Sequence, residues 1–466
     1  MTQAIIESSA SETPATLPVG GNDEYNFDYQ EVWYPVFYIE DLYKDKPNSF
    51  TLLEEDIVIW WEEKTQQWRV FADRCPHRLA PLSEGRVNEQ GLLECPYHGW
   101  SFSGDGNCQF IPQQTEEGNA QKSSRACVKS YPCKVEQDLL FVYAGNPDNA
   151  DKTPIPIVDP LEENRDKWLV LNTFRDIPYS ALTLLENVLD ASHIPYTHHG
   201  SVGDRKNVSA VELEIINSNR QGFQGLWKEG PRKGKLGSQH TTFIAPNLMW
   251  HDLTSKQFGR TMTVVYATPI SKGKCRLFAR FPFQFSSKIP QFFIKLTPRW
   301  YSHLNQNAIL EDDQIFLHYQ ERYLEKLGGS EKFAKACYLP TKADLYVSEF
   351  RKWITKYNAQ LFPNQQFPET PNHEILLERY HSHTKNCATC RQALNNIKKI
   401  RFSLTILTAF IWSLIPLMVI YLDMLPNTIL ISSTVISLIS ISVYFWLGKI
   451  EKKFFVGQVI APRNIS

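Results

Sequence analysis

Two short motifs of cysteine and histidine could bind a metal cluster. Cys75-Pro-His77 and Cys95-Pro-Tyr-His98 are separated by residues 78–94. Two thiolates and two imidazoles are the ligand set of a Rieske-type 2Fe–2S cluster, in which the imidazoles bind one iron and raise the reduction potential. A structural zinc site is the alternative, but such sites usually pair the two cysteines in one half and the two histidines in the other. The mixed halves therefore predict a 2Fe–2S cluster bound by these four side chains.

A second run of residues could bind a single iron. Asn187, Asp190 and His193 recur every three residues, so we expect them on one face of a helix. We expect Pro195 to break that helix and let His198 turn back toward the same metal. Two imidazoles and one carboxylate form the facial triad of non-haem Fe(II), which leaves positions open for O2 and substrate.

The carboxylate of this triad must come from elsewhere in the chain. The best candidate is Asp313, in a stretch with helical character, and Asp312 is the alternative. We expect Asp190 to hydrogen-bond a ligand histidine, because carboxylates beside metal sites often do so. We expect His199 to point elsewhere, since neighbours on a chain rarely share a metal.

A Cys-x-x-Cys motif, Cys387 to Cys390, lies far downstream of both sites. The interpretation that we favour is a dithiol switch controlled by thioredoxin. A small zinc site with His381 and His383 is a second possibility. Two unpaired surface thiols are the third.

Composition argues against several classes of protein. The 49 Lys and Arg residues nearly balance 50 Asp and Glu residues, and no basic tract is interleaved with aromatic residues, so we expect no nucleic acid partner. Nine cysteines spread unevenly over 466 residues do not form a disulfide scaffold and indicate a reducing compartment.

Two charge-free apolar runs, Phe402–Leu422 and Thr428–Leu447, are each long enough to cross a bilayer as a helix. Basic residues flank the pair at Lys398, Lys399, Arg401, Lys449, Lys452 and Lys453. The turn between the runs carries no positive charge, so the positive-inside rule places both ends, and the catalytic part, on the cytoplasmic side of the membrane. A buried hydrophobic hairpin in a soluble core is the alternative.

Composition shifts divide the chain into six segments. β-rich runs bounded by Gly and Pro predict an all-β domain, and mixed strand-like and helix-like runs predict an α+β domain after it. The segments are a flexible N-terminal tail (1–30), the all-β 2Fe–2S domain (31–147), the mononuclear-iron domain (148–385), a Cys-x-x-Cys linker (386–401), a transmembrane hairpin (402–448) and a basic C-terminal tail (449–466).

The order of these motifs resembles that of Rieske non-haem iron oxygenases, over roughly residues 33–320. Within that family the chain is most similar to the pheophorbide a oxygenase group of chlorophyll catabolism, which includes chloroplast-envelope relatives. The phrases CPHRLAPLSEG and CPYHGWSF, the Cys-x-x-Cys and the two C-terminal apolar runs carry this resemblance. The first 20 residues lack the Arg content of a transit peptide, so we expect a member of the cyanobacterial type.

The resemblance implies an α+β fold, in which an all-β Rieske domain joins a catalytic domain with a curved antiparallel sheet of the helix-grip type. It implies a ferredoxin-type electron donor and a chlorophyll-derived tetrapyrrole as substrate, with ring opening or side-chain oxidation as the reaction. It also implies a homotrimer in which each cluster feeds the iron of a neighbouring subunit through the region of Asp190 and Asn187.

Other functions remain open at this point. Within the enzyme class, the substrate could be protochlorophyllide or a sterol-like ring. A membrane redox sensor that uses its Cys-x-x-Cys is the alternative outside it. Phe243, Met249 and Trp250 are candidates for the substrate pocket, although aromatic residues in strands more often belong to the core.

Overall fold

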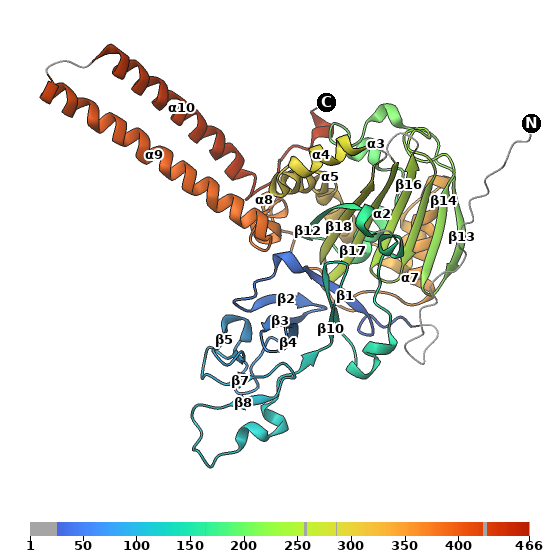
Figure 1. Ribbon diagram of the computed structural model, residues 1–466. Helices are drawn as coiled ribbons and strands as arrows, with labels where there is room; N and C mark the ends of the chain where they lie inside the picture. The colour runs from blue at the N-terminus through green and yellow to red at the C-terminus, as the bar shows by residue number, and fades with distance from the viewer. Residues whose placement is uncertain (1–25, 164, 256–258, 286, 423–425, 466) are drawn as a thin grey trace, which may run out of the picture.

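The computed structural model describes residues 26–163, 165–255, 259–285, 287–422 and 426–465. Figure 1 shows a β-rich N-terminal domain, a larger domain around a broad sheet, and two long helices that project from the body. The domains are in contact, because β1 (Trp33–Tyr38) and β2 (Asn48–Leu52) of the first pack against β17 (Gly259–Ser271) of the second.

The N-terminal domain consists of three small antiparallel sheets, of orders β1-β11-β10, β2-β3-β4-β9 and β5-β6-β7-β8. Its further strands are β3 (Glu55–Glu62), β4 (Gln67–Ala72), β5 (Arg86–Val87), β6 (Leu93–Glu94), β7 (Ser101–Phe102), β8 (Cys108–Phe110), β9 (Ser130–Tyr131), β10 (Cys133–Glu136) and β11 (Leu139–Tyr143). The predicted metal-binding loops follow β4 and β6, so the last of these sheets holds one of them directly.

The second domain is built on a seven-stranded antiparallel sheet of order β12-β18-β17-β16-β15-β14-β13. The strands other than β17 are β12 (Leu169–Ile177), β13 (Leu213–Asn219), β14 (Gly222–Trp227), β15 (Gln239–Ile244), β16 (Leu248–Ser255) and β18 (Lys274–Gln284). Together the two domains confirm the predicted α+β fold with antiparallel sheets.

Helices close the sheet over one apolar core. The helices α2 (Ala181–Leu189), α5 (Arg299–Lys326) and α7 (Leu345–Lys356) contribute Leu185, Leu317 and Phe350 to it. The shorter helices are α1 (Asp159–Glu162), α3 (Ile194–Thr197), α4 (Lys288–Leu296), α6 (Phe333–Ala336) and α8 (His373–Leu376). A second core on the other side of the sheet joins it to the N-terminal domain and to the base of the projecting helices.

The helix α5 is unusual because the face that it buries is polar. Its buried Glu311 carboxylate pairs with Arg175 of β12 and with Arg379, with nitrogen–oxygen distances of 2.6 Å to each. A buried carboxylate without such partners would be very costly. These ion pairs balance the charge of Glu311 in the interior. Asp312 and Asp313 of the same helix are buried as well.

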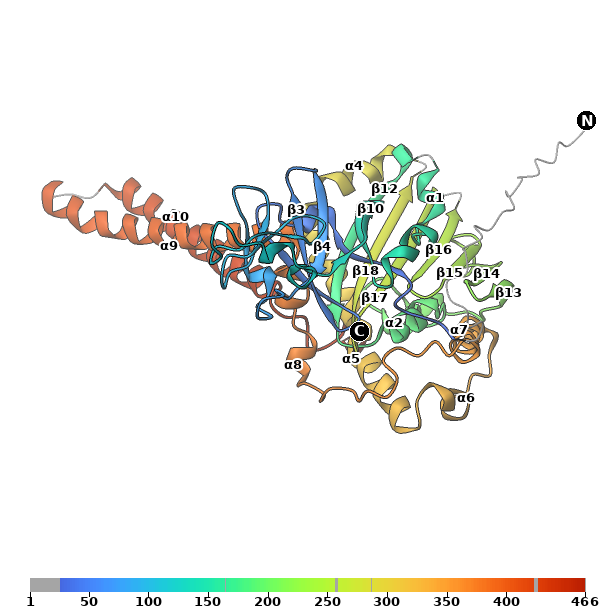
Figure 2. The same ribbon diagram turned by 90° about the horizontal axis from the view of Figure 1, so that it is seen from below.

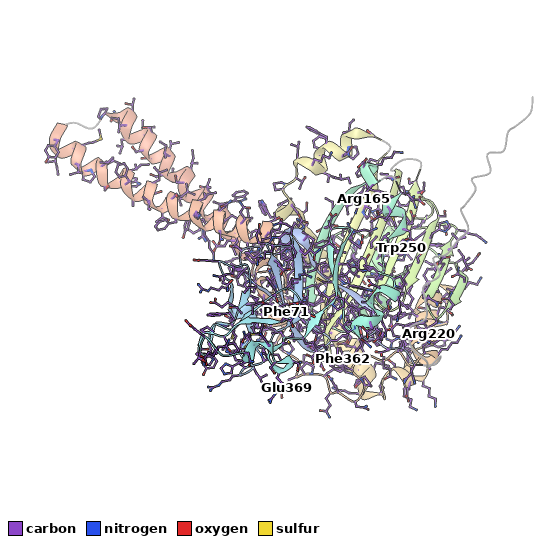
Figure 3. The ribbon with its side chains drawn as sticks, turned by 60° about the horizontal axis from the view of Figure 1, so that its bottom comes forward. Phe71, Arg165, Arg220, Trp250, Phe362 and Glu369 are labelled. Carbon is purple, nitrogen blue, oxygen red and sulfur yellow. The ribbon has the colours of Figure 1, made fainter. Side chains whose placement is uncertain are left out.

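The two projecting helices are α9 (Ala388–Leu422) and α10 (Asn427–Lys452). Both are long and apolar enough to cross a membrane. Figure 2 shows them extending away from the sheet, and Figure 3 shows that their side chains stand free on most sides. An ion pair between Arg401 and Glu451 joins them near the body of the protein.

Three segments differ from the sequence prediction. The expected linker 386–401 is helical from Ala388 onward, because nothing in it breaks the helix that leads into the apolar run. The expected C-terminal tail instead folds back onto the second domain, where Gly457 donates a backbone hydrogen bond to Leu377. Residues 26–30 of the expected N-terminal tail also pack, since the Phe27 N–H bonds the Tyr357 carbonyl. Residues 1–25 lie outside the described part of the chain.

Candidate active site

The first pair of predicted metal ligands lies on two tight loops. Cys75 and Cys95 are 1% and 2% exposed. Each loop is closed by a backbone hydrogen bond, from the Cys75 N–H to Ala80 and from the Cys95 N–H to Trp100. Burial, together with the neighbouring Cys95, raises the pKa of the Cys75 thiol to about 12. A bound cation would supply the charge needed to deprotonate it.

The predicted histidines of this site face each other on the same two loops. The ring centroids of His77 and His98 are 4.6 Å apart, and His77 stacks on Trp100 at 4.7 Å. The His77 Nδ1 atom is buried and has no hydrogen-bond partner among the described residues. A buried ring nitrogen of this kind is what a metal ligand requires. The two loops therefore fit a 2Fe–2S cluster.

The second predicted set also comes together. His193, His198 and Asp313 each offer a ligand atom, and these atoms all lie within 4.8 Å of one another. The Asp313 Oδ2 atom lies 3.2 Å from the Nε2 atom of His198. Its other oxygen, Oδ1, is buried without a partner among the described residues. Two imidazoles and one carboxylate in this arrangement fit a mononuclear non-haem iron.

Asp312 occupies a different place from Asp313, although the two are adjacent on α5. Its Oδ2 atom lies 3.2 Å from His198 Nδ1 and accepts a hydrogen bond of 2.8 Å from the Ser201 hydroxyl. His198 thus lies between the two carboxylates, with Asp313 at the nitrogen that faces His193. The geometry favours Asp313 as the iron ligand and Asp312 as the partner that orients His198.

The local path of the chain around His193 differs from our expectation. The helix α2 ends at Leu189, so Asn187 is helical but Asp190 and His193 are not on that helix. The Asp190 side chain accepts hydrogen bonds of 2.7 Å from the backbone N–H and the hydroxyl of Ser192, which competes with helical bonding. Pro195 does not break a helix; it lies in the first turn of α3, where proline is tolerated.

Within one chain, the Asp190 carboxylate does not make the hydrogen bond to a ligand histidine that we expected. Its backbone carbonyl, not its carboxylate, lies 2.6 Å from His193 Nδ1. The nearest carboxylate oxygen is 4.0 Å from that nitrogen, and the side chain is 31% exposed. The carbonyl orients His193, so its other ring nitrogen is free for a metal.

A cavity of about 760 Å³ opens beside these residues. Its lining is mostly apolar and includes Asn187, His193, His198 and Asp313. Phe243, Met249 and Trp250 do not line it, because all three are buried in the packed cores.

His251 lines the cavity, and we did not predict it. Burial lowers its pKa to about 4, so the ring is neutral at pH 7. Its Nε2 atom lies 2.8 Å from the Val188 carbonyl at the end of α2. The available signal was the period of a strand, because successive side chains point to opposite faces and His251 therefore lies on the face opposite to the core residue Trp250.

Arg463, near the C-terminus, is a second unpredicted residue at this site. Its Nη1 atom donates to the backbone carbonyls of Asp312, at 2.5 Å, and Thr197, at 3.3 Å. These two carbonyls belong to residues next to Asp313 and His198. The end of the chain therefore supports both elements that carry the candidate iron ligands.

Cys387 and Cys390 form a cluster with His383 and His303, and none of these four residues lines the cavity. His381, which we considered as a ligand, is exposed and contacts Glu378 instead. His303 takes that position, from 84 residues upstream of Cys387. The surface-thiol alternative is wrong, because both sulfurs are buried.

Comparison with known proteins identifies the family. Residues 32–132 match the Rieske [2Fe-2S] domain, and residues 243–331 match pheophorbide a oxygenase. Pheophorbide a oxygenase of Arabidopsis thaliana is 34% identical over 84% of this chain and 78% of its own length. The chain belongs to the pheophorbide a oxygenase family of Rieske oxygenases.

Other relatives carry different names. Protochlorophyllide-dependent translocon component 52 of Arabidopsis thaliana is 34% identical over 82% of this chain and 76% of its own. Flavonoid 8-hydroxylase 2 of Ocimum basilicum is 34% identical over 84% of this chain and 78% of its own. All three relatives are named as chloroplastic proteins.

Solved structures show the same fold. NdmA of Pseudomonas putida CBB5 with caffeine has a TM-score of 0.56 at 20% identity and covers 74% of this chain and 98% of its own. Dicamba monooxygenase bound to dicamba also has a TM-score of 0.56, at 23% identity, and covers 71% and 99%. The predicted family is confirmed, and so are its cofactors, a Rieske 2Fe–2S cluster and a mononuclear non-haem iron.

Proposed function

We propose that this Rieske oxygenase oxygenates a chlorophyll-derived tetrapyrrole similar to pheophorbide a, with electrons from a ferredoxin-type donor. The observation that carries the proposal is the convergence of His193, His198 and Asp313 at the wall of a large apolar cavity. A second metal-binding pair on the same chain, at Cys75 and Cys95, adds a place for electrons to enter.

The proposal gives each group of residues one task. Cys75, His77, Cys95 and His98 hold the cluster, and His193, His198 and Asp313 hold the iron. When bound, the two groups supply electron transfer and O2 activation. The chain's own residues orient the ligands, bind the substrate and exclude water around it.

Two observations support an apolar, ring-shaped substrate. The cavity volume of about 760 Å³ lies in the upper part of the range of about 300–1,000 Å³ that is usual for small-molecule sites. Three relatives of equal identity are named for pheophorbide a, protochlorophyllide and flavonoids. Identity alone does not separate these ring systems, so the substrate must be tested among them.

We further propose that α9 and α10 cross the membrane and place the catalytic domain on the cytoplasmic side. Many of their exposed side chains are large and apolar, including Phe410, Ile420 and Ile439. The basic residues that flank the pair lie at the end joined to the body of the protein. Positive charge on that side supports the proposed orientation.

A homotrimer would bring cluster and iron of different chains together. Within one chain, the sheet that carries the cluster loop, β5 to β8, and the helix α3 beside His193 lie well apart (Figure 1). The Asp190 carboxylate has no bond to a ligand histidine in its own chain and is partly exposed. Its Oδ1 atom accepts from Ser192, so Oδ2 is the oxygen that would accept a hydrogen bond from a cluster ligand of a neighbouring chain.

Turnover with labelled O2 tests the function. The full-length protein in detergent would receive reduced ferredoxin and, separately, pheophorbide a, chlorophyllide, protochlorophyllide and a flavonoid, with mass spectrometry following the label. We expect label in a tetrapyrrole product, none with His198→Ala and undiminished labelling with His199→Ala. Label only in the flavonoid would overturn the substrate, and full activity of His198→Ala would overturn the iron site.

A further inference from the structure

Four buried side chains from three separate elements converge outside the proposed active site. They are His303 of α5, His383 of η10 (Tyr380–Thr384), Cys387, and Cys390 in the first turn of α9. Their ligand atoms all lie within 4.8 Å of one another, and both cysteines are 0% exposed. All nine cysteines of the chain are free, so these two are not joined to each other.

The distances within this cluster match a tetrahedral site. The His303 Nδ1 atom lies 3.4 Å from the Cys387 sulfur and 3.5 Å from the Cys390 sulfur. The His383 Nε2 atom lies 3.3 Å from the Cys390 sulfur. Tetrahedral zinc with bonds of about 2.3 Å to sulfur and about 2.0–2.1 Å to nitrogen has sulfur–nitrogen edges of about 3.5 Å.

In each imidazole, the ring nitrogen that faces away from the sulfurs is held by a backbone carbonyl. His303 Nε2 lies 2.9 Å from the carbonyl of Asn172, and His383 Nδ1 lies 2.7 Å from the carbonyl of Phe174. Both carbonyls can only accept, so the ring nitrogens beside them carry the protons. The opposite nitrogens then present lone pairs to the two sulfurs. Histidine ligands of metals are commonly held in this way by a hydrogen bond to a backbone carbonyl.

We propose that His303, His383, Cys387 and Cys390 bind one structural zinc ion. A closed set of two thiolates and two imidazoles is typical of structural zinc sites. The site does not depend on the proposed function, because none of its ligands lines the substrate cavity. It is an alternative to the dithiol switch that we expected for the Cys-x-x-Cys, and the burial of both sulfurs favours the zinc site.

The position of the site suggests what the zinc would do. It ties the start of the projecting helix α9 to α5 and, through the two carbonyls, to β12 of the large sheet. The N-terminal domain reaches the same point, because Asp41 accepts a hydrogen bond of 2.8 Å from the Ala388 N–H. The zinc would therefore hold the apolar helix pair in one orientation relative to both domains.

Metal analysis and X-ray absorption of the full-length wild-type protein in detergent test this directly. We expect about one zinc per chain beside about three irons, with two sulfur and two nitrogen neighbours at the zinc edge. Absence of zinc would overturn the proposal, and so would a fourth iron in its place or a zinc bound without sulfur. This measurement needs no variant and so does not depend on how well a variant folds.

A matched pair of variants assigns the ligands. His383→Gln removes a proposed ligand, whereas His381→Gln changes an exposed histidine two residues away. We expect zinc to fall at least about fivefold in the first after dialysis against a chelator and to stay at about one per chain in the second. Zinc retained equally by both would overturn the proposal. The 2Fe–2S absorbance of each variant reports whether the rest of the chain is folded.

Discussion

His198 lies at the centre of the proposed iron site, because each of its ring nitrogens faces a carboxylate. Burial lowers its pKa, but the hydrogen bonds and charges of Asp312 and Asp313 outweigh this and raise it to about 9. Without a metal, the ring therefore carries a proton at pH 7. Iron must displace that proton before His198 can bind it.

Iron loading of the metal-free protein should therefore depend on pH. Since one proton leaves His198 for each iron bound, the apparent Kd for Fe(II) should fall about tenfold for each pH unit between about 7 and 9 and then level off. Anaerobic titration of the iron-depleted protein with Fe(II) at several pH values measures this. A Kd that is constant over the same range would contradict the protonated state of His198.

Asp312 and Asp313 should respond differently to the same substitution. Asp312→Asn leaves all three proposed ligands and removes only the carboxylate at His198 Nδ1, so iron affinity should fall about 10–100-fold. Asp313→Asn removes a ligand and should leave almost no iron after dialysis. Iron content, with cluster absorbance as the control for folding, distinguishes the two. Equal losses would contradict the separate roles.

Some of these site residues could be predicted from their spacing in the sequence, and others could not. The two cysteine–histidine motifs and the pair His193 and His198 are each complete within a few residues, so their types and spacing indicated metal sites. Asp312 and Asp313 are adjacent on one helix, and only the packing of that helix decides which one faces His193. His303 joins cysteines more than 80 residues away, and no pattern along the chain connects them.

At the scale of elements, α5 organises the catalytic domain. It carries Asp313 toward the cavity and His303 toward the Cys-x-x-Cys, ten residues or about 15 Å apart along its axis. Between them, Glu311 pairs with Arg175 of β12 and with Arg379. The arginines lower the pKa of Glu311 against the opposing effect of burial, which is the larger single influence, so this carboxyl stays ionised.

Breaking this ion-pair group should destabilise the fold. Glu311→Gln would leave two buried guanidinium groups without their counter-charge, which typically costs about 3–5 kcal/mol. Glu325 is also on α5, but it is more exposed than Glu311 and pairs with Lys272. Glu325→Gln should therefore cost less than about 1 kcal/mol. Denaturant unfolding in detergent, followed by tryptophan fluorescence, compares them. A similar midpoint for both would contradict the structural role of Glu311.

The architecture was easier to predict than the boundaries of its elements. β-rich runs bounded by Gly and Pro and charge-free apolar runs identified the sheets and the projecting helices, because both patterns extend over many residues. The end of α2 at Leu189 was missed, since it depends on hydrogen bonds from Ser192 to Asp190. The C-terminal segment was taken for a tail because the contacts that hold it to the second domain, such as that of Arg463 with Asp312, are with residues far away in the sequence.

At the scale of the whole molecule, the apolar helix pair is attached at a single place. Arg401 and Glu451 form an ion pair where α9 and α10 leave the body, and Gly448 lies against the same arginine. The chain therefore enters and leaves the pair at neighbouring points. The body itself contains both candidate iron sites and the proposed zinc site.

This attachment predicts that the helix pair can be removed. Replacing residues 402–448 by a short glycine-rich linker should give a protein that is soluble without detergent and keeps about three irons per chain. It should no longer bind lipid vesicles, which the full-length protein should do. Metal analysis and vesicle flotation measure both. Loss of all iron from a soluble product would contradict a self-contained body.

The contacts of Arg463 also bear on how the protein is made. Arg463 is synthesised after both apolar helices, yet it bonds the carbonyls beside two proposed iron ligands. Those bonds cannot form until Arg463 has left the ribosome. The packing around the proposed iron site is therefore completed only after both apolar helices have been synthesised. A nascent chain that has not yet exposed Arg463 lacks these contacts beside Asp313 and His198.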